Sequence, residues 1–379
     1  MAIKNITVLG SGIMGHGIAQ VSAMYGYNVV LRDIEQQFLD KALEKIKWSL
    51  EKLVSKEKIT KSQSDEIFSR IKTQVDLKEA VKLADLVIEA VPEIMDLKKK
   101  VYSELDQAAG KNVIFASNTS TLPITEIANI ISNPERFVGI HFFNPPQLMK
   151  LVEVIPGQKT APEILNQTVE YVKSVKKEPV ICKKDVPGFI VNRLFIPLVH
   201  EACWLKQREN LKMEEIDSAV KFKMGFPMGI FELADFTGMD VIHKATIELE
   251  LRDKKVILPH PEVELLFNGK KLGQKSGEGF YKYSDEKYER VQLDEKLAQR
   301  CNPIQLVANI LNNAAWLVTN KASDIAEIEK AAQLGLGLKK PLFETAKEIG
   351  IRNIVNELNE LAKKYGKFYE PDPLLVSMQ

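Results

Sequence analysis

The stretch Val8-Leu9-Gly10-Ser11-Gly12-Ile13-Met14-Gly15 decides the fold of this 379-residue chain. Its first two residues end a short run at residues 3–9 that predicts a strand. A helical pattern follows the glycines and ends near Gly26. In the dinucleotide-binding fingerprint, the first glycine permits a tight turn, the second lets backbone approach a pyrophosphate, and the third lets helix and strand pack closely. Gly10, Gly12 and Gly15 occupy these places. The helix would direct its free N–H groups at the phosphates.

Asp33 completes the fingerprint. It follows a second predicted strand at residues 28–32, where a carboxylate can accept both hydroxyls of the adenosine ribose. Such a carboxylate repels a 2′-phosphate and favours NAD over NADP, although Arg32 could hold that phosphate. The alternative is a glycine-rich turn that binds nothing, and the correct flanking strands and acid argue against it. The predicted NAD-binding residues of this region are Gly10, Gly12, Ile13, Met14, Gly15 and Asp33.

The composition is that of a globular protein with two or three domains. Hydrophobic residues make up 45% and charged residues 27% of the chain. The 52 Lys and Arg residues nearly balance the 51 Asp and Glu residues, which gives a net charge of +1. No overall field therefore favours nucleic acid or an anionic membrane. The apolar stretch at 189–205 contains polar and charged residues and does not predict a membrane span.

The three cysteines, Cys182, Cys203 and Cys301, are widely spaced and form no C-x-x-C pair. They suggest neither a disulfide framework nor a zinc site, so we expect no metal. Unpaired cysteines are typical of a reducing compartment, and we expect the protein to be cytoplasmic.

Strands and helices alternate through the first half of the chain. We predict helices near 36–54, 60–71 and 94–108, and strands near 86–88, 112–116 and 137–140. This alternation predicts an α/β fold of the Rossmann type, with a doubly wound parallel sheet. Seven lysines between residues 41 and 61 form either a solvated helix face or a surface for a phosphate-rich ligand.

Candidate catalytic groups follow the strands near 112–116 and 137–140. The polar cluster at 117–121 comes directly after one strand, and His141 ends the next. Glu153 lies within an apolar strand at 151–155, where a charge is costly unless it is paired. Pairing with His141 would hold one imidazole tautomer, which suits a general base. The alternative is a core histidine and a glutamate that faces solvent at a sheet edge, and the spacing alone does not decide between them.

Several motifs resemble those of the 3-hydroxyacyl-CoA dehydrogenases, over about residues 1–284. They are ASNTS at 116–120, HFFNP at 141–145, MKLVEVI at 149–155, DVPGFIVNR at 185–193, FPMGIFEL at 226–233 and KSGEGFY at 275–281.

The resemblance implies a hydride-transfer site. His141 would take the proton of the 3-hydroxyl, Glu153 would orient His141, and Ser120 would hydrogen-bond the reacting oxygen. Asn192 would reach the substrate from the second domain. Ser120 and Asn192 also fit plain helix-capping roles. The resemblance further implies cofactor contacts from Glu93, Lys98, Ser120, Asn144 and Lys275, and contacts to coenzyme A from Ser49 and Lys56.

The second half of the chain is helical, with predicted helices near 188–208, 214–223 and 229–250. Two histidines of this half, His243 and His260, lack metal-ligand partners nearby in sequence, and we interpret them as surface or packing residues.

An internal repeat explains the residues beyond 284. A shift of 112 residues gives 12 identities over 192–240 without a gap, including Trp204 with Trp316. The copy has lost the chemistry, because Ile304 stands where the first copy has Asn192. We predict three domains: an NAD-binding domain at 1–184, a helical domain at 185–284 and a degenerate copy of it at 285–379.

In related two-domain enzymes the helical domain pairs with its twin in a dimer. We therefore expect the copy to supply that partner within one chain, which predicts a monomer or a dimer through another surface.

The expected activity is NAD-dependent oxidation of (S)-3-hydroxyacyl-CoA, with a short acyl chain such as 3-hydroxybutyryl-CoA. One alternative is another β-hydroxyacid dehydrogenase of the same plan, which would commonly use a lysine. The other is a nucleotide-binding protein with a decayed site, which the intact Ser120, His141, Glu153 and Asn192 argue against.

Overall fold

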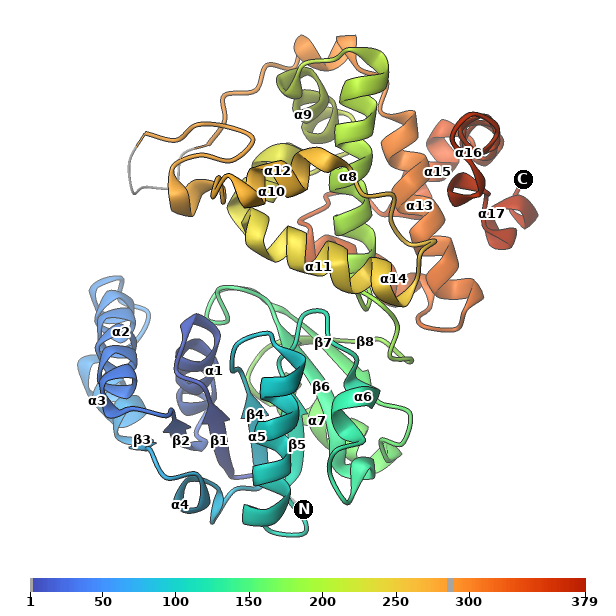
Figure 1. Cartoon of the computed structure of the whole chain (residues 1–379). Coiled ribbons are helices and arrows are strands. Elements are labelled where there is room, and N and C mark those ends of the chain that lie inside the picture. The colour runs from blue at the N-terminus through green and yellow to red at the C-terminus, as the bar shows by residue number, and fades with distance from the viewer. Residues whose placement is uncertain (1–2, 285–289) are drawn as a thin grey trace. The chain divides into compact units, whose positions relative to one another are not determined.

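The computed structural model describes residues 3–284 and 290–379. The chain divides at Asp185 into two compact units, residues 1–185 and 186–379. The first unit contains the sheet, and the described part of the second is built mainly of helices (Figure 1). In the described residues, no helix has both the length and the apolar character needed to cross a membrane.

The first unit is built on an eight-stranded sheet with the order β3-β2-β1-β4-β5-β6-β7-β8. The strands are β1 (Asn5–Leu9), β2 (Asn28–Arg32), β3 (Ile71–Gln74), β4 (Leu86–Glu89), β5 (Ile114–Ser117), β6 (Phe137–Phe142), β7 (Leu151–Pro156) and β8 (Glu178–Ile181). Strands β2 and β3 extend the sheet on one side of β1, and the chain then crosses over to add β4 and β5 on the other side. Ligands of open α/β sheets bind at such a reversal, beyond the carboxyl ends of the strands.

Two features of the sheet differ from the predictions. The β6–β7 pair is antiparallel, so the sheet is mostly but not wholly parallel. Strands β3 and β8 were not predicted, because β3 is a short edge strand with a polar sequence and β8 contains a proline. The Rossmann-type α/β architecture itself is confirmed.

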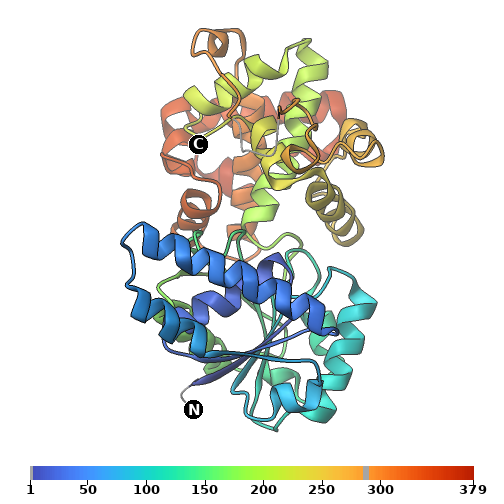
Figure 2. The same ribbon diagram turned by 90° about the vertical axis from the view of Figure 1, so that its left-hand side faces the viewer.

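Helices cover both faces of this sheet. They are α1 (Ile13–Met24), α2 (Gln36–Ser55), α3 (Lys61–Ser69), α4 (Leu77–Val81), α5 (Met95–Ala108), α6 (Ile124–Ala128) and α7 (Pro162–Ser174). Side chains of α1, α2 and α7 share one apolar core with the sheet, and α2 and α3 lie in front of the strands in Figure 2. On the other face, Tyr102 of α5 packs edge-on against Phe115 and Phe137.

Strand alternation decides which face receives the candidate catalytic groups. In β6, Val138, Ile140 and Phe142 belong to the core that α1 and α7 cover. Successive side chains of a strand point to opposite faces, so His141 points away from that core. Glu153 of β7 shares its face, since its neighbours Val152 and Val154 also enter that core.

The second unit contains two similar series of helices. The first is α8 (Val191–Glu209), α9 (Met213–Phe222), α10 (Ile230–Thr237), α11 (Met239–Arg252) and α12 (Pro261–Asn268). The second is α13 (Ile304–Thr319), α14 (Ile325–Gly335), α15 (Leu342–Ile349), α16 (Ile351–Tyr365) and α17 (Pro373–Ser377). The single helix predicted at 229–250 is wrong. Gly238, with φ of +102°, separates α10 from α11, because a continuous helix requires negative φ.

The structure repeats with the same 112-residue shift as the sequence. Adding 112 to the bounds of α10 gives the bounds of α15. Gly350, with φ of +92°, separates α15 from α16 in the same way as Gly238 separates α10 from α11.

A carboxylate caps the corresponding helix in both copies, and it is buried in the first copy and partly exposed in the second. Asp217 accepts hydrogen bonds from the backbone N–H groups of Phe231 and Glu232 at 2.9 and 3.2 Å. Glu329, 112 residues later, accepts them from Leu342 and Phe343 at 2.6 and 2.8 Å. The two residues differ, so sequence identity does not reveal this shared cap.

The two copies contact each other reciprocally. The N–H of Lys339 donates to the carbonyl of Gly225 at 3.1 Å, and Gly337 approaches Pro227. Because 337 and 339 correspond to 225 and 227, each copy presents the same two positions to the other. Such reciprocity defines an isologous, two-fold-like interface.

The central helices of this interface, α8 and α13, lie side by side (Figure 1). Arg193, near the start of α8, lies 3.2 Å from the ring centre of Trp316, near the end of α13. Arg208, near the end of α8, meets Gln305 at the start of α13 at 3.5 Å. The two helices are therefore antiparallel, as the two-fold-like relation requires.

The shared cap gives a stability prediction. Asp217→Ala and Glu329→Ala should each lower the free energy of unfolding by about 1–2 kcal/mol, because each leaves two buried N–H groups at a helix start without an acceptor. Urea denaturation measures the free energy of unfolding of each variant. The exposed Glu250→Ala, on α11, should change stability by less than about 0.5 kcal/mol. Equal stability of all three variants would contradict the capping role.

Candidate active site

The glycine loop permits a very close approach of α1 to β1. An added Cβ at Gly15 would lie 1.7 Å from the carbonyl oxygen of Gly10, so only glycine fits there. Gly10 itself has φ of +89°, which favours glycine. An added Cβ at Gly12 would meet nothing within 4 Å, which leaves the backbone open to a ligand. The helix begins at Ile13, so its free N–H groups point to this opening.

A cleft of about 650 Å³ lies at this loop. Its walls include the predicted cofactor residues Gly10, Gly12, Ile13, Met14 and Asp33, and also Arg32, Ile34, Phe38, Lys41, Lys45, Pro92, Leu97 and Val101. Ile13 and Ile34 are 61% and 63% exposed, although both are large apolar residues. Exposed apolar side chains that rim a cleft are typical of a binding site. Gly15 packs behind this cleft and does not line it.

Asp33 is fixed in place by the loop that it faces. Its Oδ2 accepts from the backbone N–H and the hydroxyl of Ser11, both at 2.6 Å, and its Oδ1 accepts from the N–H of Ile34 at 2.7 Å. The Nε of Arg32 donates to the carbonyl of Val75 at 3.0 Å. The glycine cradle, the helix start and the carboxylate fit the pyrophosphate and ribose of a dinucleotide.

The antiparallel β6–β7 pair places Glu153 directly opposite His141. The Nδ1 atom of His141 lies 2.7 Å from Oε2 of Glu153. The Glu153 side chain is fully buried and that of His141 is 7% exposed. The solvent-facing alternative for the glutamate is therefore wrong. A carboxylate in this place holds Nδ1 protonated, which makes Nε2 the basic atom of the ring.

Ser120 is held by a partly buried network at the ends of β4 and β5. Its N–H donates to Oε1 of Glu93 at 2.7 Å, and Oε2 of Glu93 lies 3.2 Å from the ammonium of Lys98. Lys98 in turn donates to Glu89 at 2.6 Å. The structure thus brings three predicted residues together and adds Glu89, which sequence reasoning missed because it treated β4 as purely apolar.

Two further polar residues, Asn118 and Gln20, form hydrogen bonds between separate segments near the site. Oδ1 of Asn118 accepts from the N–H of Phe142 at 2.9 Å, which links the end of β5 to β6. Nε2 of Gln20 donates to Ser49 at 3.0 Å, and Gln147 donates to Gln20 at 3.2 Å. Ser49 is therefore connected to the turn that contains Asn144.

Four predicted residues remain to be placed. Lys56 is the exposed C-cap of α2, and Asn144 is exposed in the turn after β6. Asn192, in the first turn of α8, and Lys275, which forms an ion pair with Asp240, belong to the second unit. Their approach to the first-unit residues stays a prediction.

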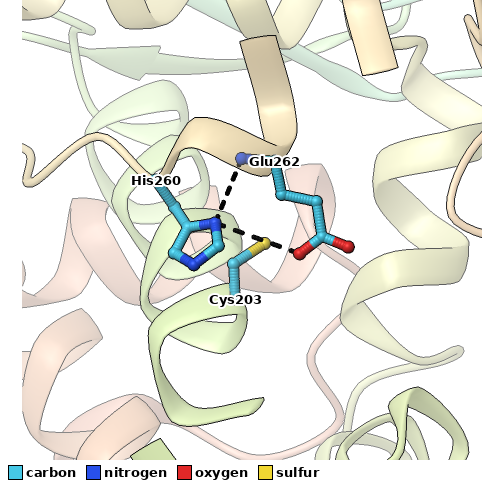
Figure 3. A group of neighbouring side chains, drawn as sticks. All are labelled: Cys203, His260 and Glu262. Atoms are coloured by element: carbon cyan, nitrogen blue, oxygen red, sulfur yellow. Dashed lines mark hydrogen bonds and ion pairs between the residues drawn. The ribbon is translucent and has the colours of Figure 1, made fainter. Parts of the chain in front are cut away.

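In the structure, His260 lies beside two residues that could act as metal ligands, which the sequence did not reveal. Figure 3 shows it with Cys203 of α8 and Glu262 of α12, and one potential ligand atom from each lies within 4.8 Å of the others. These atoms already have other partners. The carboxylate of Glu262 forms an ion pair with Lys206, and Nδ1 of His260 accepts the N–H of Glu262 at 3.2 Å.

The chemistry of Cys203, His260 and Glu262 favours a packing role over metal binding. Burial raises the pKa of the Cys203 thiol well above its usual value, which keeps it protonated. We therefore interpret the cluster as a hydrogen-bonded contact between α8 and α12. The packing interpretation also holds for His243, which stacks on Phe267 with ring centres 4.1 Å apart.

Family models match nearly the whole length of the chain. Residues 5–186 match the family described as "3-hydroxyacyl-CoA dehydrogenase, NAD binding domain". Residues 188–283 and, separately, 305–379 match "3-hydroxyacyl-CoA dehydrogenase, C-terminal domain". The first match agrees with NAD as the cofactor.

Two curated relatives and one solved structure illustrate the similarity. The chain is 43% identical to mouse "Hydroxyacyl-coenzyme A dehydrogenase, mitochondrial" over 290 residues, covering 74% of this chain and 91% of the relative. It is 35% identical to the 3-hydroxyadipyl-CoA dehydrogenase of Escherichia coli, covering 92% and 70% of the two chains.

The crystal structure of 3-hydroxybutyryl-CoA dehydrogenase from Escherichia coli superposes with a TM-score of 0.90 at 28% identity. The superposition covers 100% of this chain and 98% of that one, so it includes both helical series. Together with the family matches over nearly the whole length, these similarities show that the chain belongs to the 3-hydroxyacyl-CoA dehydrogenase family.

Proposed function

We propose that this protein oxidises the 3-hydroxyl group of short (S)-3-hydroxyacyl-CoA thioesters with NAD. The observation that carries the proposal is the buried His141–Glu153 pair, with Nδ1 and Oε2 2.7 Å apart. It stands at the same carboxyl edge of the sheet as the glycine loop and the Ser120 segment. A base, a dinucleotide cleft and a hydroxyl donor on one edge are what alcohol oxidation needs.

Each of the candidate site residues has its own part in the proposed reaction. NAD, when bound, supplies the hydride acceptor. Nε2 of His141 takes the proton of the 3-hydroxyl, and Glu153 stabilises the imidazolium that forms. The hydroxyl of Ser120 donates a hydrogen bond to the same oxygen, and Asn192 adds a contact from the second unit. Such donors matter because negative charge develops on that oxygen during proton removal.

The CoA moiety would lie along α2. The lysines of this helix and the residues after it supply positive charge, and Ser49 and Lys56 are the contacts that the family resemblance implies. Gln20 of α1 donates to Ser49 and accepts from Gln147, so these two hydrogen bonds connect α2 to the turn after β6 and support the placement of Ser49. The names of the similar proteins include hydroxybutyryl and hydroxyadipyl thioesters, which supports a short acyl chain.

The second helical series would replace a partner subunit. Its two-fold-like contacts with the first series, through Gly225 with Lys339 and Pro227 with Gly337, have the reciprocity of a homodimer interface. We therefore assign three domains, at 1–184, 185–284 and 285–379, and a monomeric assembly or a dimer through another surface. The three buried cysteines carry free thiols, which supports a reducing compartment such as the cytoplasm.

An assay with and without the thioester tests the function. Acetoacetyl-CoA should oxidise NADH, whereas acetoacetate without CoA should not. His141→Gln should lower kcat by about 10²–10⁴-fold, because glutamine can keep a hydrogen bond to Glu153 but cannot accept the proton. His243→Gln, the same change at a packing histidine, is the control and should keep full activity. Unchanged turnover in His141→Gln would refute the assigned base.

Asp33 should determine affinity for the cofactor alone. Asp33→Ala should raise the KM for NAD by about 10–100-fold, because two hydrogen bonds to a charged group are lost. The KM for acetoacetyl-CoA should stay unchanged. Asp40→Ala, an exposed acid on α2, is the control for loss of charge. An equal rise in both KM values would mean that Asp33 supports the whole site rather than the ribose.

The oligomeric state tests the role of the second series. The full chain should sediment as a monomer, or as a dimer that forms through a surface other than the contact between α8 and α13. Deletion of residues 286–379 should expose the apolar side of α8 that α13 covers, and the shortened chain should associate or become insoluble. A well-behaved monomer of the shortened chain would contradict the proposal.

A further inference from the structure

The buried carboxylate of Asp235, on α10 of the second unit, is not explained by the proposed reaction. Only 1% of this residue is exposed. A buried charge is costly unless hydrogen bonds satisfy it, so the partners of Asp235 indicate its role. Among the described residues, its hydrogen-bond partners all lie within residues 273–283, which we call the Lys275 segment.

Asp235 accepts from three donors of the Lys275 segment. Its Oδ1 accepts from the N–H of Phe280 at 2.8 Å. Its Oδ2 accepts from the N–H of Tyr281 at 2.8 Å and from the hydroxyl of Tyr283 at 2.9 Å. An ionised carboxylate can accept all three bonds, and bonds to a charged acceptor are stronger than neutral ones. This one side chain therefore anchors the later part of the segment to α10.

Two glycines let the Lys275 segment approach Asp235 closely. An added Cβ at Gly279 would lie 2.0 Å from Oδ1 of Asp235, and one at Gly273 would lie 2.2 Å from the carbonyl oxygen of Asp235. A larger residue at either position would push the segment away from α10. The glycine at 279, which belongs to the KSGEGFY motif, is thus required by the contact with Asp235.

The anchored segment carries Lys275. The N–H of Gly273 donates to the carbonyl of Glu278 at 2.9 Å, which folds the segment back on itself. Lys275 lies in the short helical turn at Gln274–Ser276, between these two residues. Its ammonium pairs with Asp240 in the first turn of α11. The anchor at Asp235 therefore fixes the place from which Lys275 extends.

The second helical copy separates this anchor from plain packing. Both copies keep the carboxylate cap, at Asp217 and Glu329. In contrast, the exposed Lys347 of α15 stands where α10 has Asp235. The helical series thus packs without a carboxylate at this position. Asp235 belongs to the copy that contains Asn192, which indicates a role in the site.

The charge states of the cluster fit an anchor. Burial raises the pKa of Asp235 to about 6, against the lowering effect of its three hydrogen-bond donors. The carboxylate is therefore ionised at pH 8 and can accept all three bonds. Burial and the charge of Asp235 raise the pKa of Tyr283 well above its usual value, so its hydroxyl stays protonated and can donate.

We propose that Asp235 is a positioning residue that holds the Lys275 segment and thereby places Lys275 for contact with NAD. Asp235 acts through Lys275 and does not touch the cofactor, because its carboxylate is buried and engaged by the segment. The inference rests on the predicted contact between Lys275 and NAD, whereas the anchor stands on the distances above.

Asp235→Asn tests the proposal at pH 8. Asparagine keeps the shape of the side chain but replaces one acceptor oxygen with an NH₂ group, so one N–H of the segment loses its acceptor. The KM for NADH should rise about 10-fold, while kcat and the KM for acetoacetyl-CoA stay within about threefold of wild type. A purely structural role of Asp235 would not raise the KM for NADH alone.

A double-variant comparison shows whether Asp235 works through Lys275. Lys275→Met should by itself raise the KM for NADH about 10-fold, because a charged contact is lost. In that background Asp235→Asn should raise it less than about twofold further, since the contact that it positions is already gone. Two effects that multiply in the double variant would contradict the proposal.

Hydrogen exchange tests the anchor without turnover. The N–H groups of Phe280 and Tyr281 should exchange faster in Asp235→Asn than in wild type. Tyr283→Phe removes a single hydrogen bond and serves if Asp235→Asn does not fold; it should change exchange and the KM for NADH in the same direction by a smaller factor. Glu250→Gln, the same loss of charge at an exposed acid of α11, is the control and should match wild type in every measurement.

The outcomes distinguish the anchor from the contact with NAD. Unchanged exchange at Phe280 and Tyr281 in Asp235→Asn would overturn the anchor. A raised KM for NADH in Lys275→Met but not in Asp235→Asn would overturn the positioning role. If exchange becomes faster and neither variant raises the KM for NADH, the predicted contact between Lys275 and NAD is wrong, and with it the role that we propose for Asp235.

Discussion

The whole first unit depends on one steric constraint, the backbone contact between Gly10 and Gly15. Since an added Cβ at Gly15 would lie 1.7 Å from the Gly10 carbonyl oxygen, α1 can approach β1 only without that side chain. This approach directs the start of α1 at the cleft and seats Asp33 against Ser11. The side of the cleft next to the start of α1 is therefore formed by backbone, and the Asp33 carboxylate is held by the same loop.

Burial of charge shapes the catalytic edge of the sheet. His141 with Glu153, and Lys98 with Glu89, place ionisable groups where water is nearly absent, and the partly exposed Glu93 joins the second pair. Each of these groups has a partner at hydrogen-bond distance, as low-dielectric surroundings require. The pairs consequently have fixed orientations. That rigidity suits a site in which a proton and a hydride must leave one carbon and its oxygen together.

The second unit reaches a two-fold-like arrangement with one chain. Reciprocal contacts at Gly225 and Gly337, and the antiparallel packing of α8 on α13, join two copies of one helical series. The second copy keeps the elements that pack, such as the carboxylate cap at Glu329, while Ile304 stands in the place of Asn192. The second copy thus keeps packing positions of the first, while the residue at the place of Asn192 is different.

The sequence by itself determined the glycine loop, the acid at Asp33, the alternation of strands and helices and the repeat, because these depend on local spacing and periodicity. It also identified His141 and Glu153 but left their pairing open. The tertiary structure decided that pairing, since only the antiparallel turn of β7 against β6 sets the two residues opposite each other. It also decided the partners of Glu89, the neighbours of His260 and the break at Gly238. Each of these depends on groups that are distant in sequence or on backbone geometry that residue patterns do not encode.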